Sequence, residues 1–235
     1  MLEAKPDEKQ TVLNEIIATL KNDLKAHPAL NIKILSFLFS SLEPTNLLRL
    51  ELFEEIVKEC RASHKEYLFM PYLENLSKIL PLEKAPTDQA VRLYTSIIGV
   101  LKEKEKNDIM SKNIDALFNL LSSKPTEELA RHADQLHRCL TYLISNEEKI
   151  FQVENYLCNP LVKQIFAKDE ALRNSWNKFT SGDLKGADDF YNHNQKYFKE
   201  DKLSLEDVKD KMRFYRISQI ADQNQSMTAG STNSR

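Results

Sequence analysis

Residues 126–143, TEELARHADQLHRCLTYL, decide the fold class of this chain. Leu129, Leu136 and Leu140 recur there at helical spacing, and most of the residues between them are polar. This period places the apolar side chains on one face of an amphipathic helix. We therefore predict one continuous helix over this segment, the longest clear helix of the chain, with Thr126 as its N-cap.

The same helical period runs outward through nearly all of the 235 residues. No stretch alternates apolar and polar residues for long enough to suggest a strand, and glycine occurs only four times. Paired helices recur about every 30 to 45 residues, a spacing typical of repeat architectures. We therefore predict an all-α fold, a right-handed helical solenoid of stacked helix pairs similar to HEAT or tetratricopeptide arrays. No tetratricopeptide or ankyrin consensus is present.

The sequence predicts three parts. N-terminal helical repeats occupy residues 1–125, and a second helical part occupies residues 126–222. Residues 223–235, ending in SMTAGSTNSR, have no apolar face, and a disordered tail is predicted there.

Local signals predict where individual helices begin and end. Thr45 is expected to cap a helix that carries Leu48, Leu52 and Ile56, and a helix is expected from Tyr67 to Leu80. Further along the chain, Gly182 is expected to end one helix, Asp183 to cap the next, and Ser204 to cap the last.

The charge balance disfavours a nucleic-acid binder. The net charge is −2 with 29% charged residues, whereas such proteins usually show a strong basic excess. The last predicted helix is locally basic, with aromatic residues interleaved. It could contact RNA or an acidic partner, although a solvated or protein-facing helix surface is the favoured interpretation. Its basic residues are Lys209, Lys211, Arg213 and Arg216.

No residue pattern indicates catalysis, a cofactor or a metal. His132 and His137 are five residues apart, which turns them about 140° from each other on a helix, so they cannot share a metal ion as an i, i+4 pair would. Helical enzymes that bind metal through DDxxD or HD motifs are the alternative class. Asp188-Asp189 is the one adjacent aspartate pair, no further acid follows at Asn192 or His193, and no HD dipeptide occurs.

The sequence also suggests a compartment. Three cysteines without CxxC spacing fit a reducing environment. No apolar run approaches the roughly 20 residues that span a bilayer, and the first residues do not resemble a signal peptide. We expect a cytoplasmic protein with no membrane contact.

Large aromatic residues concentrate in the last third of the chain. Such side chains contribute much of the binding energy at protein interfaces, and they also fill cores. The sequence alone does not separate these two roles. The candidate protein-interaction residues are Phe190, Tyr191, Tyr197, Phe198, Phe214 and Tyr215.

Residues 133–213 resemble the PCI family, which is named for the proteasome lid, the COP9 signalosome and initiation factor 3. The likeness extends to the earlier segment ILSFLF at residues 34–39, so it covers most of the chain, although its motifs are short and degenerate. The matching residues are Ala133, His137-Arg138-Cys139, Phe151, the Leu157–Val162 turn around Pro160, Phe179, Leu184, Phe190, Tyr191, Phe198 and Met212-Arg213.

The resemblance implies a helical solenoid that ends in a winged helix and has no catalytic residues. Within the family the likeness is greatest to a subunit of eukaryotic translation initiation factor 3. It implies a scaffold whose partners are the other PCI and MPN subunits and, through the complex, the small ribosomal subunit. A subunit of the COP9 signalosome or of the proteasome lid is the alternative.

The chain departs from the family pattern after Met212-Arg213. In the family a winged helix follows there, and most of it is missing here, so we expect an incomplete winged helix and doubtful stable incorporation into a complex. The helix from Ser204 to Ala221 is then expected to lack packing partners and to exchange its amide hydrogens quickly.

Overall fold

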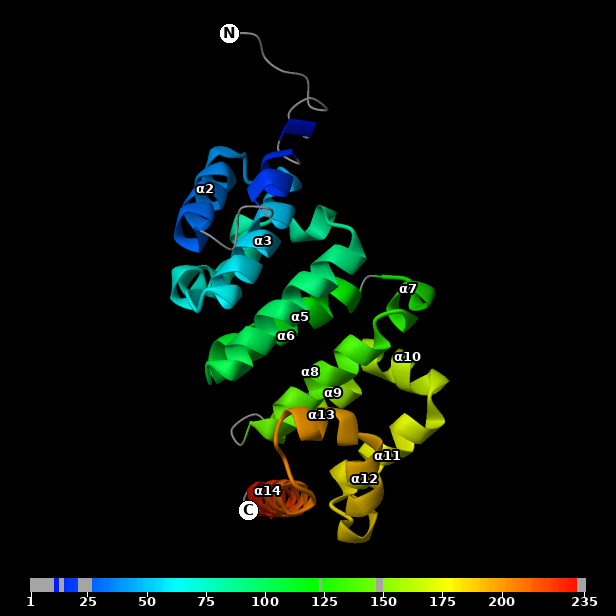
Figure 1. Cartoon of the computed structure of the whole chain (residues 1–235). Coiled ribbons are helices and arrows are strands. Elements are labelled where there is room, and N and C mark those ends of the chain that lie inside the picture. Colours follow the sequence, from blue (N-terminus) through cyan, green and yellow to red (C-terminus); the bar gives the residue numbers. More distant parts are fainter. Residues whose placement is uncertain (1–10, 13–14, 21–26, 123, 147–149, 232–235) are drawn as a thin grey trace. The chain divides into compact units, whose positions relative to one another are not determined.

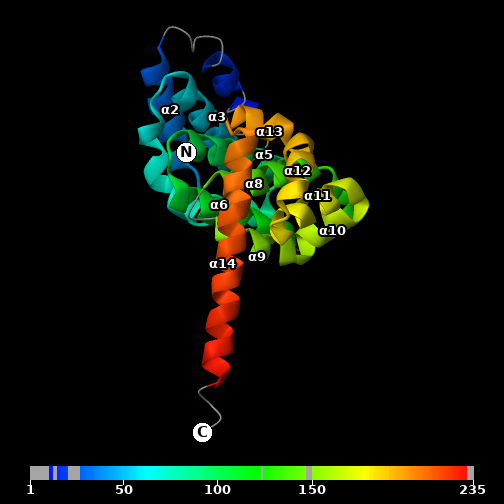
Figure 2. The same cartoon turned by 90° about the horizontal axis from the view of Figure 1, so that it is seen from below.

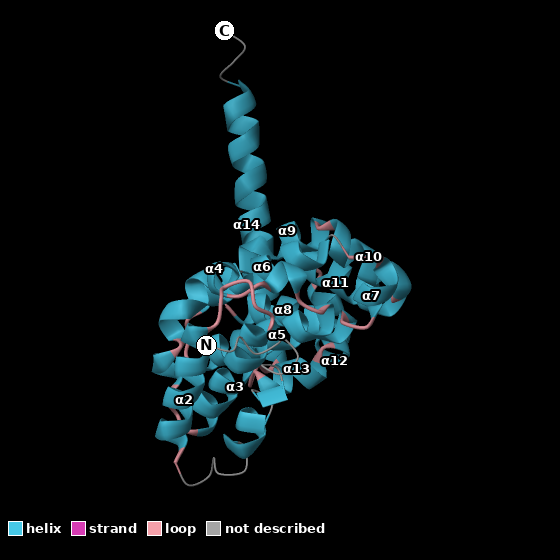
Figure 3. Cartoon of the chain, turned by 90° about the horizontal axis from the view of Figure 1, so that it is seen from above, coloured by secondary structure: helices cyan, strands magenta, loops and turns pink. Residues whose placement is uncertain are grey.

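Every regular element in the described part of the chain is a helix, and none is a strand (Figure 3). The computed structural model describes residues 11–12, 15–20, 27–122, 124–146 and 150–231. The predicted all-α class is therefore confirmed. The chain divides into two compact units, residues 1–117 and 118–235, so the division lies inside α6 (Asn107–Ser122) rather than at residue 125.

In the first unit, α2 packs on α3, and α3 packs on α5 (Figure 1). The predicted stripe of α3 is buried, including Leu48, Leu52 and Ile56, because this face meets helices on two sides. The elements before α6 are α2 (Pro28–Ser41), α3 (Leu48–Ala62), η1 (Glu66–Leu68), η2 (Met70–Asn75), α4 (Leu76–Ile79), η3 (Leu82–Lys84) and α5 (Thr87–Glu103).

Two local predictions in this unit are wrong. The N-cap position of α3 is Leu47 and not Thr45, and just before the helix the Oδ1 of Asn46 accepts a hydrogen bond from the Leu48 amide at 2.9 Å. The segment from Tyr67 to Leu80 consists mainly of 3₁₀ turns followed by the single turn of α4. Pro71 lies in the middle of this segment, and a proline there lacks the amide hydrogen that a continuous α-helix requires.

In the second unit, the prediction of one continuous helix over residues 126–143 is wrong. Residues 126–143 form two helices, separated by a turn at Arg131–His132, and Thr126 is the first helical residue rather than the N-cap. The turn lets the first helix pack on α10 and the second on α9 and α13. The elements are α7 (Thr126–Ala130), α8 (Ala133–Ser145), η4 (Ile150–Gln152), α9 (Val153–Cys158), α10 (Pro160–Lys168), α11 (Glu170–Ser181), η5 (Leu184–Gly186), α12 (Ala187–His193), α13 (Gln195–Glu200) and α14 (Leu205–Ser231).

The turn after α11 forms as the sequence predicts. Gly182 adopts a left-handed conformation, with φ of 65°, and ends the helix. A Cβ at this position would lie 2.8 Å from the Cβ of Arg216 on α14, so the turn also needs glycine for close packing. Asp183 then accepts a hydrogen bond from the Lys185 amide and caps η5.

Helix α14 packs on its own unit and continues beyond it. Its first turns contact α11, α12, η4 and η5, where Val208, Met212 and Tyr215 are buried, and Ser204 caps it as predicted by accepting a hydrogen bond from the Asp207 amide. Figure 2 shows the rest of the helix extending away from the other elements of this unit. One expectation is corrected here, because the helix has packing partners. The helix runs to Ser231, into the segment 223–235 for which a disordered tail is predicted.

The length of α14 has a simple cause. No proline follows Ser204, and the first glycine is Gly230, so no strong helix breaker interrupts residues 205–229. The absence of an apolar face does not by itself end a helix that is already nucleated by packing at its other end. The last residues of the predicted tail, 232–235, lie outside the described part of the chain.

Candidate functional site

Helix α14 presents three large apolar side chains at the surface of the second unit. Phe214, Ile217 and Ile220 are 58%, 63% and 45% exposed. They follow one another at three-residue spacing and lie on one side of the helix, whereas Val208 and Met212 on the opposite side are fully buried. We call these three residues the α14 stripe. Contiguous exposed apolar side chains of this kind mark interaction surfaces, unlike singly scattered ones.

The six predicted interaction residues divide between core and surface. Phe190, Tyr197, Phe198 and Tyr215 are buried, so their side chains are unavailable to a partner of the folded unit. The interpretation of these four as interface residues is corrected to core. Tyr191 is half-buried, and Phe214 is the exposed member of the set.

The buried aromatics pack around Trp176 of α11. Phe190 lies 5.4 Å from its ring in an edge-to-face arrangement, and Phe166 of α10 stacks on it at 6.3 Å. Phe179 contacts both Trp176 and Tyr215, at 6.0 and 5.5 Å between ring centroids. These geometries are the favourable ones for aromatic pairs, and they join α10, α11, α12 and α14 into one core.

The hydroxyl groups of the buried tyrosines have acceptors. Tyr215 donates to Glu154 Oε2 at 3.0 Å, and Tyr197 donates to the Asp134 carboxylate. Burial, reinforced by these carboxylates, raises the pKa of both phenols. They therefore stay protonated at neutral pH and serve as structural hydrogen-bond donors.

His137 lies in the core and forms part of a polar network. Its Nε2 is 2.6 Å from Asn194 Oδ1, and the Asn194 amide nitrogen donates to the Phe190 carbonyl at 2.8 Å. This second bond fixes the orientation of the amide, so His137 Nε2 carries the hydrogen. Burial lowers the pKa of His137 to about 4, so the ring is neutral at pH 7.

Arg138 makes the charged part of the same network. Its guanidinium donates to Asp201 Oδ1 at 2.8 Å and to the Tyr197 carbonyl at 3.1 Å, and it lies over the Tyr142 ring at 4.2 Å. The Asp201 side chain is only 1% exposed. Arg138 thus links α8 to α13 by hydrogen bonds between residues about 60 positions apart, which local sequence patterns do not predict.

The basic residues of α14 are largely engaged within their unit. Lys211 is buried, and Arg216 packs along the Gly182 turn. Neighbouring carboxylates therefore offset much of the charge that could attract RNA, and direct RNA contact through these residues stays an untested prediction. The ion pairs are Lys209–Asp188 at 3.6 Å, Arg213–Glu206 at 3.2 Å and Arg213–Asp210.

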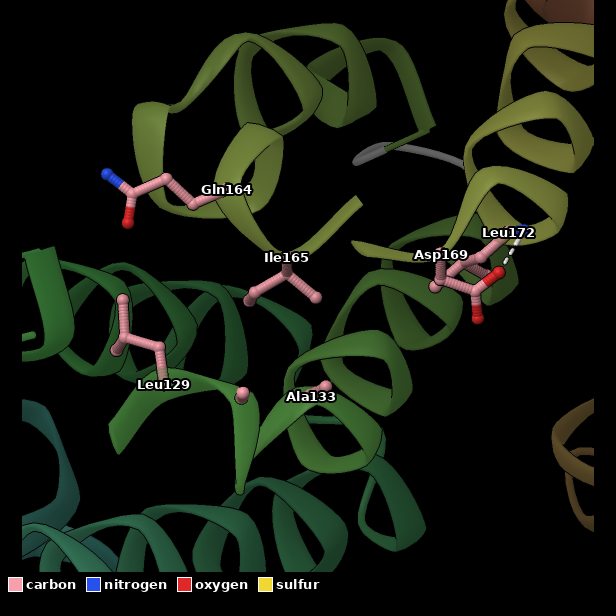
Figure 4. Close-up of a pocket in the computed structure, with 7 residues that line it drawn as sticks. Leu129, Ala133, Gln164, Ile165, Asp169 and Leu172 are labelled. Atoms are coloured by element: carbon pink, nitrogen blue, oxygen red, sulfur yellow. Dashed lines mark hydrogen bonds between the residues drawn. The ribbon is translucent and has the colours of Figure 1, made fainter. Parts of the chain in front are cut away.

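A small cavity of about 120 Å³ lies between α7, α8, α10 and α11 (Figure 4). Leu129, Ile165 and Leu172 give it an apolar wall. The one carboxylate of the lining, Asp169, is already used as the N-cap of α11, where it accepts a hydrogen bond from the Leu172 amide at 2.9 Å. The cavity thus has the size and the chemistry to take one apolar side chain.

The adjacent aspartates compared with the DDxxD metal motif, Asp188 and Asp189, lie in surface ion pairs. Asp189 pairs with Lys178 at 2.5 Å, and Asp188 pairs with Lys209. Within the described residues, no three His, Cys, Asp or Glu side chains gather as metal ligands do. His132 and His137 are both buried.

Comparison with known proteins finds no matching family model, no matching curated protein and no matching solved structure. The PCI resemblance and the function it implies therefore stay predictions. Separately, none of the helices that the structure describes is both long and apolar enough to cross a membrane.

Proposed function

We propose that this chain is a non-catalytic scaffold subunit of eukaryotic translation initiation factor 3, most like its m subunit. In this role it supports assembly of the pre-initiation complex on the small ribosomal subunit, in the cytoplasm. Its direct partners are other PCI and MPN subunits of the factor. The resemblance of residues 133–213 to the PCI family supports the proposal, and the all-α fold is compatible with it.

The observation that carries a scaffold function is the α14 stripe. Phe214, Ile217 and Ile220 offer an apolar row on a helix that extends from its unit, and burial of such a row is the main driving force of association. A specific interface of standard size buries about 1,600 Å² in total, centred on a few large side chains. In this proposal the three side chains of the α14 stripe form the centre of the interface with a partner.

The finer architecture belongs to the same proposal. Successive helices that pack in pairs, such as α2 with α3 and α11 with α12, support a solenoid of the PCI type. In that arrangement α14 occupies the position at which a family member begins its winged helix. The α14 stripe is then the face that a neighbouring subunit covers.

The proposal is tested by affinity purification of the tagged chain from eukaryotic cells, followed by mass spectrometry and sedimentation on a sucrose gradient. We expect recovery of initiation factor 3 subunits, with part of the chain sedimenting with small ribosomal subunits. Recovery of proteasome lid or COP9 signalosome subunits instead would contradict the assignment to this factor. A chain that stays at the top of the gradient without partners would contradict the scaffold function.

A matched pair of variants tests the surface. Ile217→Glu with Ile220→Glu places two charges on the α14 stripe, and Leu30→Glu with Phe37→Glu places two on exposed apolar positions of α2. We expect the first pair to reduce partner recovery about tenfold or more, because charges at the centre of an apolar interface are strongly disfavoured. The second pair should retain recovery. Equal recovery from both would show that α14 is not the docking surface.

A further inference from the structure

A larger pocket of about 350 Å³ lies between α9, α10 and α11 of the second unit. We call it the α10–α11 pocket. Leu157, Phe166 and Trp176 give it an apolar floor, and two cationic side chains reach it from different helices. No residue of its lining carries a carboxylate. The remaining lining residues are Lys163, Ala167, Arg173 and Asn177.

Trp176 lines this pocket with a side chain that is buried in the aromatic core of the unit. The residue is 1% exposed, and its indole N–H has no acceptor among the described residues. Because the indole nitrogen itself is buried, Trp176 serves the pocket as an apolar wall.

The two cations are available for exchange with a ligand. Lys163 on α10 is exposed. Arg173 on α11 lies 3.7 Å from Glu170, in a pair whose side chains are 47% and 79% exposed. Such a solvent-exposed pair contributes little to stability, so a better-placed carboxylate can displace Glu170 from Arg173 at small cost.

From this combination we propose that the α10–α11 pocket binds an acidic peptide segment of a partner protein. A carboxylate of the peptide lies between Lys163 and Arg173, while a neighbouring apolar side chain covers Leu157 and Phe166. Charge complementarity selects the acidic peptide, and the apolar floor distinguishes it from a bare anion such as phosphate. The pocket is separate from the α14 stripe, so this inference does not depend on which complex the chain joins.

The chain provides its own probe for this site, because Trp176 is its only tryptophan. The experiment titrates the full chain with a nine-residue, tryptophan-free peptide of alternating Asp and Leu, followed by Trp176 emission. The matched control peptide carries Asn in place of each Asp. We expect a saturable change in emission with the acidic peptide and binding at least tenfold weaker with the control, because hydrogen bonds to charged groups are the stronger ones.

Variants of the chain test whether the peptide binds in the α10–α11 pocket. Their affinity for a labelled copy of the peptide is measured by fluorescence anisotropy. Lys163→Glu and Arg173→Glu should each weaken binding about tenfold, because each reverses a charge that faces the peptide carboxylate. Lys112→Glu, an exposed residue of α6 in the first unit, makes the same change of charge and should leave binding unchanged. Circular dichroism and thermal unfolding of each variant verify that it is folded.

Three results would overturn the inference. Equal binding of the Asp and Asn peptides would show an apolar site without charge selection. Displacement of the peptide by inorganic phosphate at equal concentration would show an anion site instead of a peptide site. Retention of binding by the folded Lys163→Glu and Arg173→Glu variants would place the peptide elsewhere on the chain.

Discussion

Arg138 holds the buried charge of Asp201 in the second unit. The Asp201 carboxylate also accepts from the Ser145 hydroxyl at 3.1 Å, so its oxygens are well satisfied as long as the guanidinium is present. Removing one partner of a buried pair is costly, because the remaining charge stays in a low-dielectric environment without compensation. Loss of the Arg138 guanidinium should therefore destabilise the second unit by leaving the Asp201 carboxylate buried without a cation.

We predict that Arg138→Met lowers the free energy of unfolding by about 3 kcal/mol. Lys196→Met is the matched control, because Lys196 pairs with Asp134 in a contact whose side chains are 65% and 64% exposed, and it should cost less than about 1 kcal/mol. Urea unfolding followed by circular dichroism measures both. A cost for Arg138→Met as small as that of the control would show that Asp201 is solvated in the native state.

His137 makes stability depend on pH. In the unfolded chain a histidine binds its proton with a pKa of about 6.5, and in the native state burial lowers this pKa to about 4. Between these values the unfolded chain binds the proton and the native state does not. The contribution of His137 to stability is therefore complete above pH 6.5 and is lost as the pH falls toward 4.

The second prediction concerns this pH dependence. We expect about 2 kcal/mol of the stability lost between pH 7.5 and pH 5 to come from His137. His137→Gln keeps a hydrogen-bond donor toward Asn194 but cannot titrate, so its loss of stability over this range should be smaller by that amount. Urea unfolding at both pH values measures the difference between the two chains. Identical losses would mean that His137 is protonated in the native state.

At the scale of the element, α14 combines two environments in one helix. Its first turns are anchored by the Ser204 cap and by buried Val208, Met212 and Tyr215, whereas the α14 stripe, which begins at Phe214, lies on the exposed side of the helix. Amide protection follows the free energy of local opening, which is high where side chains are buried and low where they are exposed.

We predict a gradient of hydrogen exchange along α14. Amides of residues 208–216 should exchange at least a hundredfold more slowly than those beyond Ala221, because opening the first group must also open the aromatic core. Hydrogen–deuterium exchange with mass spectrometry resolves the two halves as separate peptides. Uniformly fast exchange would support the original expectation that this helix lacks packing partners.

Elements were predicted well where the signal is local. The buried stripe of α3, the Gly182 turn and the Ser204 cap follow from residue period and from capping chemistry within a few residues. The single helix predicted over residues 126–143 was wrong, because contacts of α7 with α10 and of α8 with α13 favour a turn at Arg131–His132 over helical continuity. Such tertiary contacts override helix propensity.

At the scale of the whole molecule, each unit carries its own buried thiol. Cys60 lies in the first unit and Cys139 in the second, and burial raises the pKa of these thiols to about 11 and about 12. Cys158 is exposed. Thiol reactivity needs both access and the thiolate form, so the three cysteines should differ sharply in rate.

We predict that Ellman's reagent modifies one thiol of the native chain quickly and all three in 8 M urea. The Cys158→Ser variant should lose the fast phase completely, which identifies the reactive residue. In that variant, thiol modification across a urea titration then reports on both cores, because Cys60 and Cys139 lie in different units. Fast modification of two or three thiols in buffer would show that at least one core opens readily.

The sequence by itself determined the all-α class, the buried stripe of α3 and the caps at Asp183 and Ser204, since these depend on residues within one or two helical turns of each other. Only the tertiary structure decided which aromatics form the core and which reach the surface. It also decided the buried network of α8, in which His137 meets Asn194 and Arg138 meets Asp201, 57 and 63 residues away. Periodicity indicates that a side chain faces inward or outward from its helix, but the partner that covers it is set by how distant helices pack.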